Sequence, residues 1–410
     1  MTGVAMISLH TSPLAQPGEG DCGGMNVYVR ELAASLAQGG VPVSVYVRAW
    51  RDGLPSRLQV EPHFEVVHVA AGPMSMAKED LPGVLDAFAD GVATDLAARG
   101  RLAPSVLHAN YWLSGVAAHR LKHRLSMPLV TTFHTLAAVK SEAGDPEPTE
   151  RERAEREVIG CSDRICAANA LEAAHLIDLY DADPERIEIA APGVDRAFFS
   201  PGDQGGARRA LGLPSGVPLL VFVGRIQPLK GLELAVSALA ELRDPTTQLL
   251  VVGGPSGREG ADELRRVEAR IAALGLAGRV RFVDPQPHHL LSTYYRAADV
   301  CVVPSRSESF GLVALEAAAC GTPVVASAVG GLTGLVEDGA TGRLVAGRDP
   351  SIWAAAIDDV MSDPARRARL GRAAVRLSHR FGWASTAARL RRVYADLSVE
   401  RVPASCGVGA

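Results

Sequence analysis

The chain has 410 residues, of which 47% are hydrophobic and 21% are charged. At roughly 150 residues per domain, this length predicts two or three domains, and the composition excludes a disordered chain, a collagen-like repeat and a small disulfide scaffold. The 42 basic and 46 acidic residues give a formal net charge of −4. No basic excess remains to neutralise a nucleic-acid backbone, so nucleic acid is not an expected partner.

Neither a membrane span nor a signal peptide is indicated. A spanning helix needs about 20 consecutive apolar residues, but the longest apolar stretch, Leu312–Leu332, contains Glu316 and several glycines. Residues Val4–Leu9 have no basic segment before them and predict a first β-strand. The six cysteines show no CxxC spacing, which argues against a zinc knuckle or redox motif, and Cys301 and Cys320 lie in apolar runs that predict burial. These features favour a cytoplasmic location.

Short apolar runs alternate with helical stretches along the chain. Strands are predicted at 4–9, 43–47, 106–108, 129–132, 219–223, 249–252, 280–283, 300–303 and 323–326, and helices at 24–38, 81–98, 261–274 and 310–320. Nearly continuous apolar strands separated by helices indicate parallel sheets covered on both faces. The predicted fold class is therefore α/β and doubly wound.

A domain boundary is indicated near the middle of the chain. Residues 191–194 and 200–203 each contain a Pro-Gly pair, and two such pairs close together are typical of a linker. A new alternation of strands and helices begins at Pro218.

This boundary predicts two Rossmann-like domains, an N-terminal one over 1–195 and a C-terminal one over 196–380. Residues 378–397 form an Arg-rich amphipathic pattern, which predicts a last helix. We expect the C-terminal segment 381–410 to cross back onto the first domain.

The first glycine-rich segment, Gly18–Gly23, matches the pattern GxGxxG. A dinucleotide fingerprint needs its glycines directly after a strand and an acidic residue about 20 positions on, and neither condition is met here. Gly23 and Gly24 nevertheless precede a predicted helix, whose free amides and dipole suit an anion such as a diphosphate. A flexible loop with a glycine turn explains this segment equally well.

Two cations follow the first strand of the predicted second domain. Arg225 lies two residues after the strand 219–223, and Lys230 follows five residues later. Ligands of open α/β sheets bind at the carboxyl ends of the strands, and a guanidinium and an ammonium both suit phosphate. A solvated loop with ordinary surface charges is the alternative.

Two glutamates with seven residues between them follow the strand 300–303. Glu308 lies in the predicted loop, and Glu316 lies about two turns into the next helix. The residues that open this helix, and whose free amides could hold a diphosphate, are Ser309, Phe310, Gly311 and Leu312. Glu316 could bridge two ribose hydroxyls and Glu308 could accept hydrogen bonds from a sugar. An acidic first turn would explain Glu308 but not Glu316.

This Glu308–Glu316 spacing, with Arg225 and Lys230 before it, resembles the retaining glycosyltransferases of the GT-B, family 4 group. The run from His10 to Tyr28 is similar to the mycothiol-pathway members of that family, which transfer N-acetylglucosamine from UDP-GlcNAc to 1D-myo-inositol 3-phosphate. Further matching stretches extend the resemblance over roughly residues 4–360. It implies a GT-B fold, in which two Rossmann-like domains face a deep interdomain cleft.

The resemblance also implies roles for single residues in donor binding and catalysis. Gly23 and Gly24 would lie against the donor diphosphate, while Arg225 and Lys230 would bind the phosphates and stabilise the leaving UDP. Glu316 would hold the ribose, Glu308 the transferred sugar, and His134 the sugar near the reaction centre. The implied catalytic residues are Arg225, Lys230, Glu308 and His134.

Five further positions match those that hold the acceptor phosphate in the family: Asn26, Lys78, Tyr111, Thr135 and Arg151. Two cations and two hydroxyl groups are also what phosphate recognition requires. The ordinary alternatives are surface ion pairs for Lys78 and Arg151 and core packing for Tyr111.

Some positions depart from the family's pattern, among them Cys22, Arg156 and the segment 168–170. They leave the donor chemistry intact but keep a second acceptor class open. The alternative is a paralogous glycosyltransferase of aminoglycoside-type or lincosamide-type antibiotic biosynthesis, with an aminocyclitol or a small thiol such as ergothioneine as acceptor and another nucleotide sugar as donor. Two other classes are a sugar-nucleotide epimerase, which needs no acceptor phosphate site, and a non-catalytic binding protein, which would not need Glu308, Arg225 or Lys230.

The expected mechanism is transfer with retention at the anomeric carbon. The acceptor hydroxyl attacks the face that the diphosphate leaves, through an oxocarbenium-like transition state, and a diphosphate oxygen takes its proton. Arg225, Lys230 and the amides near Gly311 stabilise the growing charge, and closure of the two domains excludes water. No Asp-x-Asp motif is present, so neither a metal nor a cofactor is expected beyond the nucleotide sugar, a co-substrate. The resemblance implies a homodimer.

Overall fold

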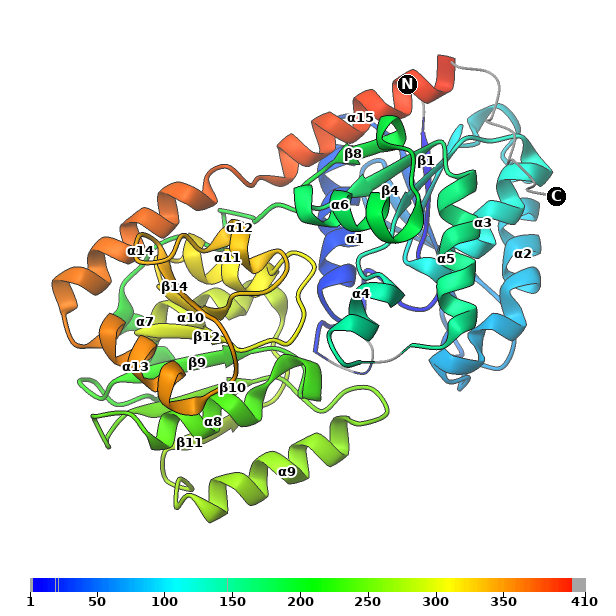
Figure 1. The fold of residues 1–410 in the computed structure, drawn as a ribbon. Coiled ribbons are helices and arrows are strands. Elements are labelled where there is room, and N and C mark those ends of the chain that lie inside the picture. Colours follow the sequence, from blue (N-terminus) through cyan, green and yellow to red (C-terminus); the bar gives the residue numbers. More distant parts are fainter. Residues whose placement is uncertain (1–2, 19, 21, 146, 400–410) are drawn as a thin grey trace. The chain divides into compact units, whose positions relative to one another are not determined.

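The structure, a computed structural model, describes residues 3–18, 20, 22–145 and 147–399. These form two compact units, coloured by sequence in Figure 1. Unit 1 contains residues up to 15, 25–191 and those from 383 onward, and unit 2 contains 16–24 and 192–382.

The segment 16–24 corrects the sequence-based division at residue 195, which placed it in the first domain. It belongs to unit 2, because the Gln16 Nε2 atom donates to the carbonyl of Pro285 at 2.8 Å and the Gly18 backbone packs on the Pro285 ring. A loop that follows a strand of one unit is thus part of the other unit.

Unit 1 is built on an eight-stranded sheet with the order β3-β4-β2-β1-β5-β6-β7-β8. Its strands are β1 (Val4–Ile7), β2 (Val43–Arg48), β3 (Arg57–Glu61), β4 (Phe64–Val69), β5 (Val106–Asn110), β6 (Leu129–Thr132), β7 (Arg164–Ala167) and β8 (Ile187–Ile189). The pairings are parallel except that β3 is antiparallel to β4. The predicted strands did not include this hairpin, whose two-residue connection permits only an antiparallel pair.

The helices of unit 1 lie on both faces of this sheet (Figure 1). They are α1 (Gly24–Gln38), α2 (Leu85–Ala98), α3 (Trp112–Leu125), α4 (Ala137–Glu142), α5 (Thr149–Cys161), α6 (Ala170–Tyr180) and α15 (Trp383–Val399), with 3₁₀ turns at Lys78–Val84, Gly100–Leu102 and Pro184–Arg186. Val4 and Met6 face the core formed with α1 and α15, and Ala5 and Ile7 face the core formed with α2 and α3. Side chains alternate between the faces of a strand, so β1 is covered on both sides.

In unit 1, two predicted helix starts are wrong. The helix predicted at 81–98 begins at Leu85, because the preceding 3₁₀ segment contains Pro82. The helix predicted at 378–397 begins at Trp383, since Gly382 lies between it and the previous helix and glycine disfavours a helix interior. The part of the predicted C-terminal segment beyond residue 399 lies outside the described residues.

The last helix, α15, packs in unit 1. The Trp383 ring lies 5.6 Å from the ring of Tyr28 in an edge-to-face arrangement, and the hydroxyl of Tyr394 is 2.6 Å from Nδ1 of His108 on β5. Leu390 and Leu397 are buried in the same core. The C-terminal helix therefore completes a core that the first 191 residues leave open.

Unit 2 is built on a six-stranded sheet with the order β11-β10-β9-β12-β13-β14. Its strands are β9 (Leu219–Val223), β10 (Gln248–Val252), β11 (Val280–Val283), β12 (Val300–Val303), β13 (Val324–Ser327) and β14 (Gly342–Val345), all paired in parallel. Leu220 and Phe222 of β9 face a core that also holds Trp353. The two sheets confirm the predicted class of two parallel, Rossmann-like α/β domains.

The helices of unit 2 also cover both faces of its sheet. They are α7 (Gln204–Ala210), α8 (Leu232–Ala240), α9 (Gly260–Ala273), α10 (Leu291–Ala297), α11 (Leu312–Ala319), α12 (Leu332–Leu335), α13 (Pro350–Met361) and α14 (Pro364–Ser378), with 3₁₀ turns at Pro228–Lys230 and His288–Leu290. Helix α11 starts at Leu312 rather than at the predicted Phe310, because its cap Gly311 has a φ of 105°. Glu316 is therefore about one turn into the helix, not two.

The helices and the cysteines can be compared with the predictions made for membrane spans and for buried thiols. No helix of the described residues combines the length and the hydrophobicity that a membrane crossing requires. Cys301 and Cys320 are buried, as predicted. Cys161, at the end of α5, is disulfide-bonded, which the sequence analysis did not anticipate.

Candidate active site

Strand order locates one candidate site in each unit. In an open parallel sheet, ligands bind beyond the carboxyl ends of neighbouring strands from which the chain proceeds in opposite directions. In unit 1 these strands are β1 and β5, and in unit 2 they are β9 and β12. The loops after β9 and β12 carry Arg225, Lys230 and Glu308, and Tyr111 directly follows β5.

The two loops of unit 2 are held together at Lys230 and Glu308. The Lys230 Nζ atom lies 2.7 Å from Glu308 Oε2, and the backbone N–H of Arg306 donates to the carbonyl of Leu229 at 2.8 Å. Gly231 has a φ of 72°, and a Cβ there would lie 2.2 Å from the Pro304 carbonyl oxygen. Only glycine permits this approach, which holds a cation and a carboxylate side by side.

Gly23 and Gly24 join this cluster from the segment 16–24. A Cβ on Gly23 would lie 3.2 Å from Nε of Arg225, and one on Gly24 would lie 3.4 Å from a methyl group of Leu312. The two predicted diphosphate-binding segments of the sequence thus meet within unit 2. Glu19 and Asp21, which belong to the same motif, lie outside the described residues.

The start of α11 offers backbone rather than side-chain donors. Phe310 is buried, and its ring packs 5.7 Å from the ring of Phe381, so its side chain belongs to the core. The carbonyl of Glu308 accepts a hydrogen bond from the N–H of Gly331 at 2.8 Å, which fixes the turn that contains Ser309. The first amides of the helix have no partner within the helix and suit an anionic ligand.

Glu316 is buried and held by two partners that the sequence analysis missed. Its Oε1 atom lies 2.6 Å from Nε2 of His288, and its Oε2 atom accepts the hydroxyl of Tyr295 at 2.9 Å. Burial and the neighbouring Glu316 raise the pKa of Tyr295 well above its ordinary value. His288 follows β11, so its place at the carboxyl edge of the sheet was the available signal.

In unit 1, two cations lie against the ring of Tyr111. The Lys78 Nζ atom is 4.9 Å, and the Arg151 guanidinium carbon 5.0 Å, from the ring centroid, within the range of a cation–π interaction. Tyr111 caps α3 with a φ of 78°, and His134 has a φ of 63°. Such backbone strain in non-glycine residues is typical of functional sites.

Arg151 is fixed by carboxylates and by Thr135. Its Nη2 atom donates to the carbonyl and the hydroxyl of Thr135 at 2.9 and 3.0 Å, and it forms ion pairs with Glu155 and Glu147 at 2.8 and 2.9 Å. Burial alone would lower the pKa of this guanidinium, but Tyr111 and the two carboxylates outweigh that effect and raise it. Arg151 is only 2% exposed, so it is not the surface ion pair considered as its alternative.

Glu155 holds the Arg151 guanidinium in position, and the sequence analysis missed this residue too. This fully buried carboxylate accepts hydrogen bonds from the N–H of Ala137 at 2.9 Å and from the hydroxyl of Tyr180 at 2.6 Å, besides that of Arg151. Both of its oxygens accept hydrogen bonds, and the three donors come from α4, α5 and α6. The guanidinium is therefore held in place before any ligand arrives.

His134 is held in a neutral state. Its Nε2 atom lies 3.0 Å from Asn110 Oδ1, and its ring meets that of Tyr28 edge to face at 4.7 Å. Burial, with a smaller effect of His108, lowers its pKa to about 3. At neutral pH the ring keeps one N–H and can donate or accept a hydrogen bond, but it lacks the second proton that an imidazolium would supply as an acid.

Asn26 contacts a different segment from the other four predicted acceptor residues, which are Lys78, Tyr111, Thr135 and Arg151. Its amide nitrogen donates to the Thr11 hydroxyl at 2.5 Å and to the Ser12 carbonyl at 2.6 Å. The ring of His10, which precedes Thr11, lies 4.6 Å from the Tyr111 ring in a tilted arrangement. Asn26 therefore holds the loop after β1 against the group formed by Lys78, Tyr111, Thr135 and Arg151, here called the Tyr111 cluster.

Comparisons with known proteins cover most of the chain. The family model described as Glycosyl transferases group 1 matches residues 203–376, and the model described as Glycosyltransferase Family 4 matches residues 22–198. The D-inositol 3-phosphate glycosyltransferase of Frankia alni is 49% identical over 397 residues, which cover 94% of this chain and 97% of that protein. A protein of the same name from Thermobispora bispora is 46% identical over 418 residues, covering 99% and 97%.

Solved structures agree with the fold. The sucrose-phosphate synthase from Thermosynechococcus elongatus superimposes with a TM-score of 0.91 at 33% identity, covering 98% of this chain and all of that one. The Anabaena protein HepE in complex with UDP and glucose reaches a TM-score of 0.79 at 20% identity, over 97% of this chain and all of that one. The second similarity is one of fold alone.

Proposed function

We propose that this chain, which belongs to the group 1 and family 4 glycosyltransferases, transfers N-acetylglucosamine from UDP-GlcNAc to 1D-myo-inositol 3-phosphate with retention of configuration. Relatives that share nearly half of its residues over almost its full length are named as D-inositol 3-phosphate glycosyltransferases. The observation that carries the proposal is the arrangement of two cations and a threonine around Tyr111.

The acceptor phosphate is proposed to bind beside Tyr111, between Lys78 and Arg151. Both cations lie within 5.0 Å of one ring centroid, and the guanidinium is held by Thr135 and Glu155. A phosphate dianion matches two cations, and charge-assisted hydrogen bonds to it are shorter and stronger than neutral ones. An acceptor without an anionic group would form no ion pair with Lys78 or Arg151.

The donor is proposed to bind at the cluster of unit 2. Arg225 and Lys230 would face the diphosphate together with the amides at the start of α11, and Glu316 would accept hydrogen bonds from the ribose. In the structure the Lys230 ammonium is paired with Glu308, so the donor phosphate would share this ammonium with the Glu308 carboxylate. As the bond to the sugar breaks, negative charge grows on the leaving diphosphate, where fixed cations are most effective.

The proton of the acceptor hydroxyl is proposed to pass to an oxygen of the leaving diphosphate. His134 would orient the sugar as a neutral hydrogen-bond partner, because its pKa is about 3. The plot of activity against pH should therefore show no inflection between pH 5 and 8 that is due to His134.

The proposal is tested with the purified protein, UDP-GlcNAc and 1D-myo-inositol 3-phosphate, following UDP release and product mass. Lys78→Ala and Arg151→Ala each remove a charged contact to phosphate, a loss of about 1.5–3 kcal/mol, and should raise the acceptor KM about 10- to 100-fold while the donor KM stays the same. The matched control is Arg156→Ala, on the same helix α5 but 43% exposed in its side chain, which should change neither value.

Two results would contradict the proposal. One is absence of product with inositol phosphate but turnover with an aminocyclitol or a small thiol, which would point to the antibiotic-type acceptors. The other is an equal KM for inositol and its phosphate. The expected homodimer, the cytoplasmic location and the independence from metal stay predictions, to be checked by sedimentation, by fractionation of cells and by assays with a chelator.

A further inference from the structure

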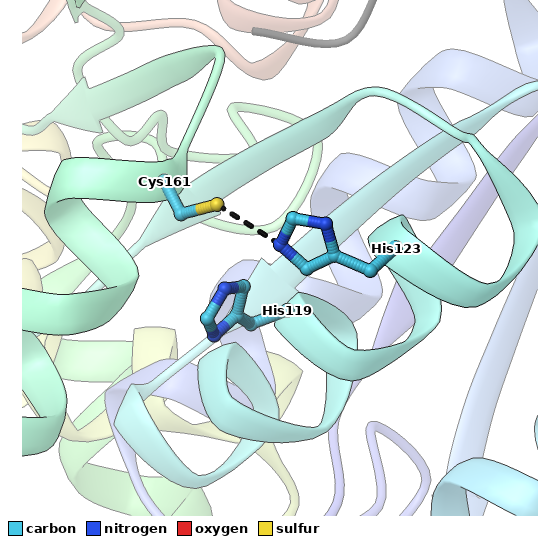
Figure 2. Close-up of side chains that lie close together, drawn as sticks. All are labelled: His119, His123 and Cys161. Atoms are coloured by element: carbon cyan, nitrogen blue, oxygen red, sulfur yellow. Dashed lines mark hydrogen bonds between the residues drawn. The ribbon is translucent and has the colours of Figure 1, made fainter. Parts of the chain in front are cut away.

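Two histidines and a cysteine gather at the far ends of helices α3 and α5. His119 and His123 are one turn apart on α3, and Cys161 is the last residue of α5. Figure 2 shows the two imidazoles and the sulfur facing one another. Cys161 Sγ lies 3.3 Å from Nε2 of His123, and the three ligand atoms lie within 4.8 Å of one another.

We propose that His119, His123 and the reduced thiolate of Cys161 bind a borderline-soft divalent cation of the Zn²⁺ class. Imidazole nitrogen and thiolate sulfur are the ligands that zinc prefers, with bonds of about 2.0–2.1 and 2.3 Å. Such bonds place tetrahedral ligand atoms about 3.3–3.6 Å apart. The observed spacing needs only small rotations of the side chains, and water would fill the fourth position.

The positions of these ligands are fixed by close packing of their helices. A Cβ on Gly115 of α3 would lie 3.0 Å from a methyl group of Val158 on α5, so the helices approach closely. Lys122, which is 1% exposed, lies between the two histidines in sequence and donates to the Cys161 carbonyl at 2.7 Å and to Asp163 at 2.8 Å. This buried ion pair ties the end of α5 to α3.

A carboxylate outside the cluster completes the pattern of a metal site. Glu157 Oε1 lies 3.5 Å from Nδ1 of His119. A carboxylate that accepts the second ring N–H of a histidine ligand fixes its tautomer and orientation. With Nδ1 engaged in this way, His119 presents Nε2 to the cation.

Cys161 makes the site dependent on redox state. Its sulfur is disulfide-bonded in the structure, and only a thiolate is a strong ligand. A thiol or phosphine reductant must first supply two electrons, with two protons, to convert the disulfide into two thiols. The cation then displaces the proton of the Cys161 thiol. Oxidation of the two thiols back to the disulfide, with loss of two electrons and two protons, releases the cation.

The cluster lies away from the Tyr111 cluster but on the same helices. Tyr111 caps α3 and Arg151 lies near the start of α5, whereas the histidines and Cys161 follow about 12–18 Å further along at 1.5 Å per residue. A cation bound there would join the two helices that present the Tyr111 cluster. It would stabilise unit 1 without taking part in sugar transfer.

The test is titration of the full chain, reduced with a phosphine, with Co²⁺ as a spectroscopic probe and Zn²⁺ as competitor. We expect one Co²⁺ per chain, a cobalt–thiolate charge-transfer band, and its loss on addition of Zn²⁺, which binds such sites more tightly. The band should be absent in His119→Ala, His123→Ala and Cys161→Ser. Glu157→Gln should weaken binding about tenfold.

The redox dependence and the folding controls complete the test. Oxidation with diamide should abolish binding and reduction should restore it, and Zn²⁺ should raise the melting temperature of the reduced chain by about 5 °C. His379→Ala, outside the cluster, should bind like the parent, and circular dichroism should show all variants folded. Binding without the thiolate band, or binding unchanged in the His123→Ala variant or in the oxidised chain, would overturn the proposal.

Discussion

Glu172 is a buried carboxyl that closes the start of α6. Its Oε2 atom accepts the N–H of Ala168 at 2.6 Å, while its own N–H donates to the Asn169 side chain at 2.9 Å. This reciprocal pair resembles a capping box. Because burial disfavours the charged form more than one hydrogen bond favours it, the pKa of Glu172 is raised to about 7.

This raised pKa predicts a stability that falls with pH. The unfolded chain releases the proton of Glu172 near the ordinary glutamate pKa of 4.5, whereas the folded chain keeps it up to about pH 7. The stabilisation is therefore complete below about pH 4.5 and lost as the pH rises through 7, by about 3 kcal/mol in total. Urea unfolding between pH 5 and 8 measures it.

Glu172→Gln should flatten this pH dependence, because the amide keeps an acceptor oxygen and does not titrate. Glu152→Gln, at an exposed position of α5, is the matched control and should leave the slope as it is. A slope equal in the parent and in Glu172→Gln would show that another group is responsible.

At the residue scale, sequence spacing could predict the proposed donor-binding residues of unit 2 but not the residues that hold them. Arg225, Lys230, Glu308 and Glu316 are recognisable because each lies a fixed distance after a strand. His288 and Tyr295 reach Glu316 through the tertiary fold, from 28 and 21 residues away in the chain, and no local pattern marks them. Glu155 lies four residues after Arg151 on the same helix, so an i, i+4 pair of opposite charges was the available signal.

At the scale of elements, α14 packs on the end of α11 through glycine. A Cβ on Gly371 of α14 would lie 2.2 Å from the carbonyl oxygen of Gly321, which follows α11. The two backbones are thus in direct contact. Helix α11 carries Glu316, so α14 supports the helix on which the proposed ribose site depends.

Gly371→Ala should force these helices apart and lower the free energy of unfolding by about 1–3 kcal/mol, the usual effect of overpacking. Gly160→Ala is the matched control on α5, where nothing lies within 4 Å of the new methyl group, and it should stabilise the chain by about 0.5–1 kcal/mol. Chemical unfolding compares the two. A stabilising Gly371→Ala would contradict the backbone contact.

Several predicted strands have the observed bounds. The strands at 129–132, 219–223, 280–283 and 300–303 agree with β6, β9, β11 and β12 residue by residue. The predicted strands do not include β3, β4, β7, β8 and β14. Of these, β3 is exposed or half-buried and β8 has only three residues, but β4 and β7 lie inside the sheet and are largely buried. Charged residues in them, Glu65 and Arg164, interrupt the apolar run by which a buried strand is recognised.

At the scale of the whole molecule, neither unit is a continuous stretch of sequence. Unit 1 needs α15, which buries Trp383, Leu390, Tyr394 and Leu397 in a core with α1. A single cut in the chain after residue 191 therefore separates a unit from part of its own core.

The fragment 1–191 should accordingly be incompletely folded. Without α15 it exposes the apolar face of α1 and β5, and it should bind a hydrophobic dye and melt without a cooperative transition by circular dichroism. Addition of a peptide spanning residues 383–399 should restore the transition, whereas the same peptide with Leu390→Asp and Tyr394→Asp should not. Cooperative unfolding of 1–191 alone would refute this dependence on α15.

The return of α15 also sets the order in which the protein is completed during synthesis. When the ribosome has released residue 382, unit 2 has all of its segments, including 16–24. The N-terminal unit, although it is translated first, still lacks its last helix at that moment. The first unit to emerge is therefore the last to be finished, and its open apolar face must stay protected from aggregation until translation ends.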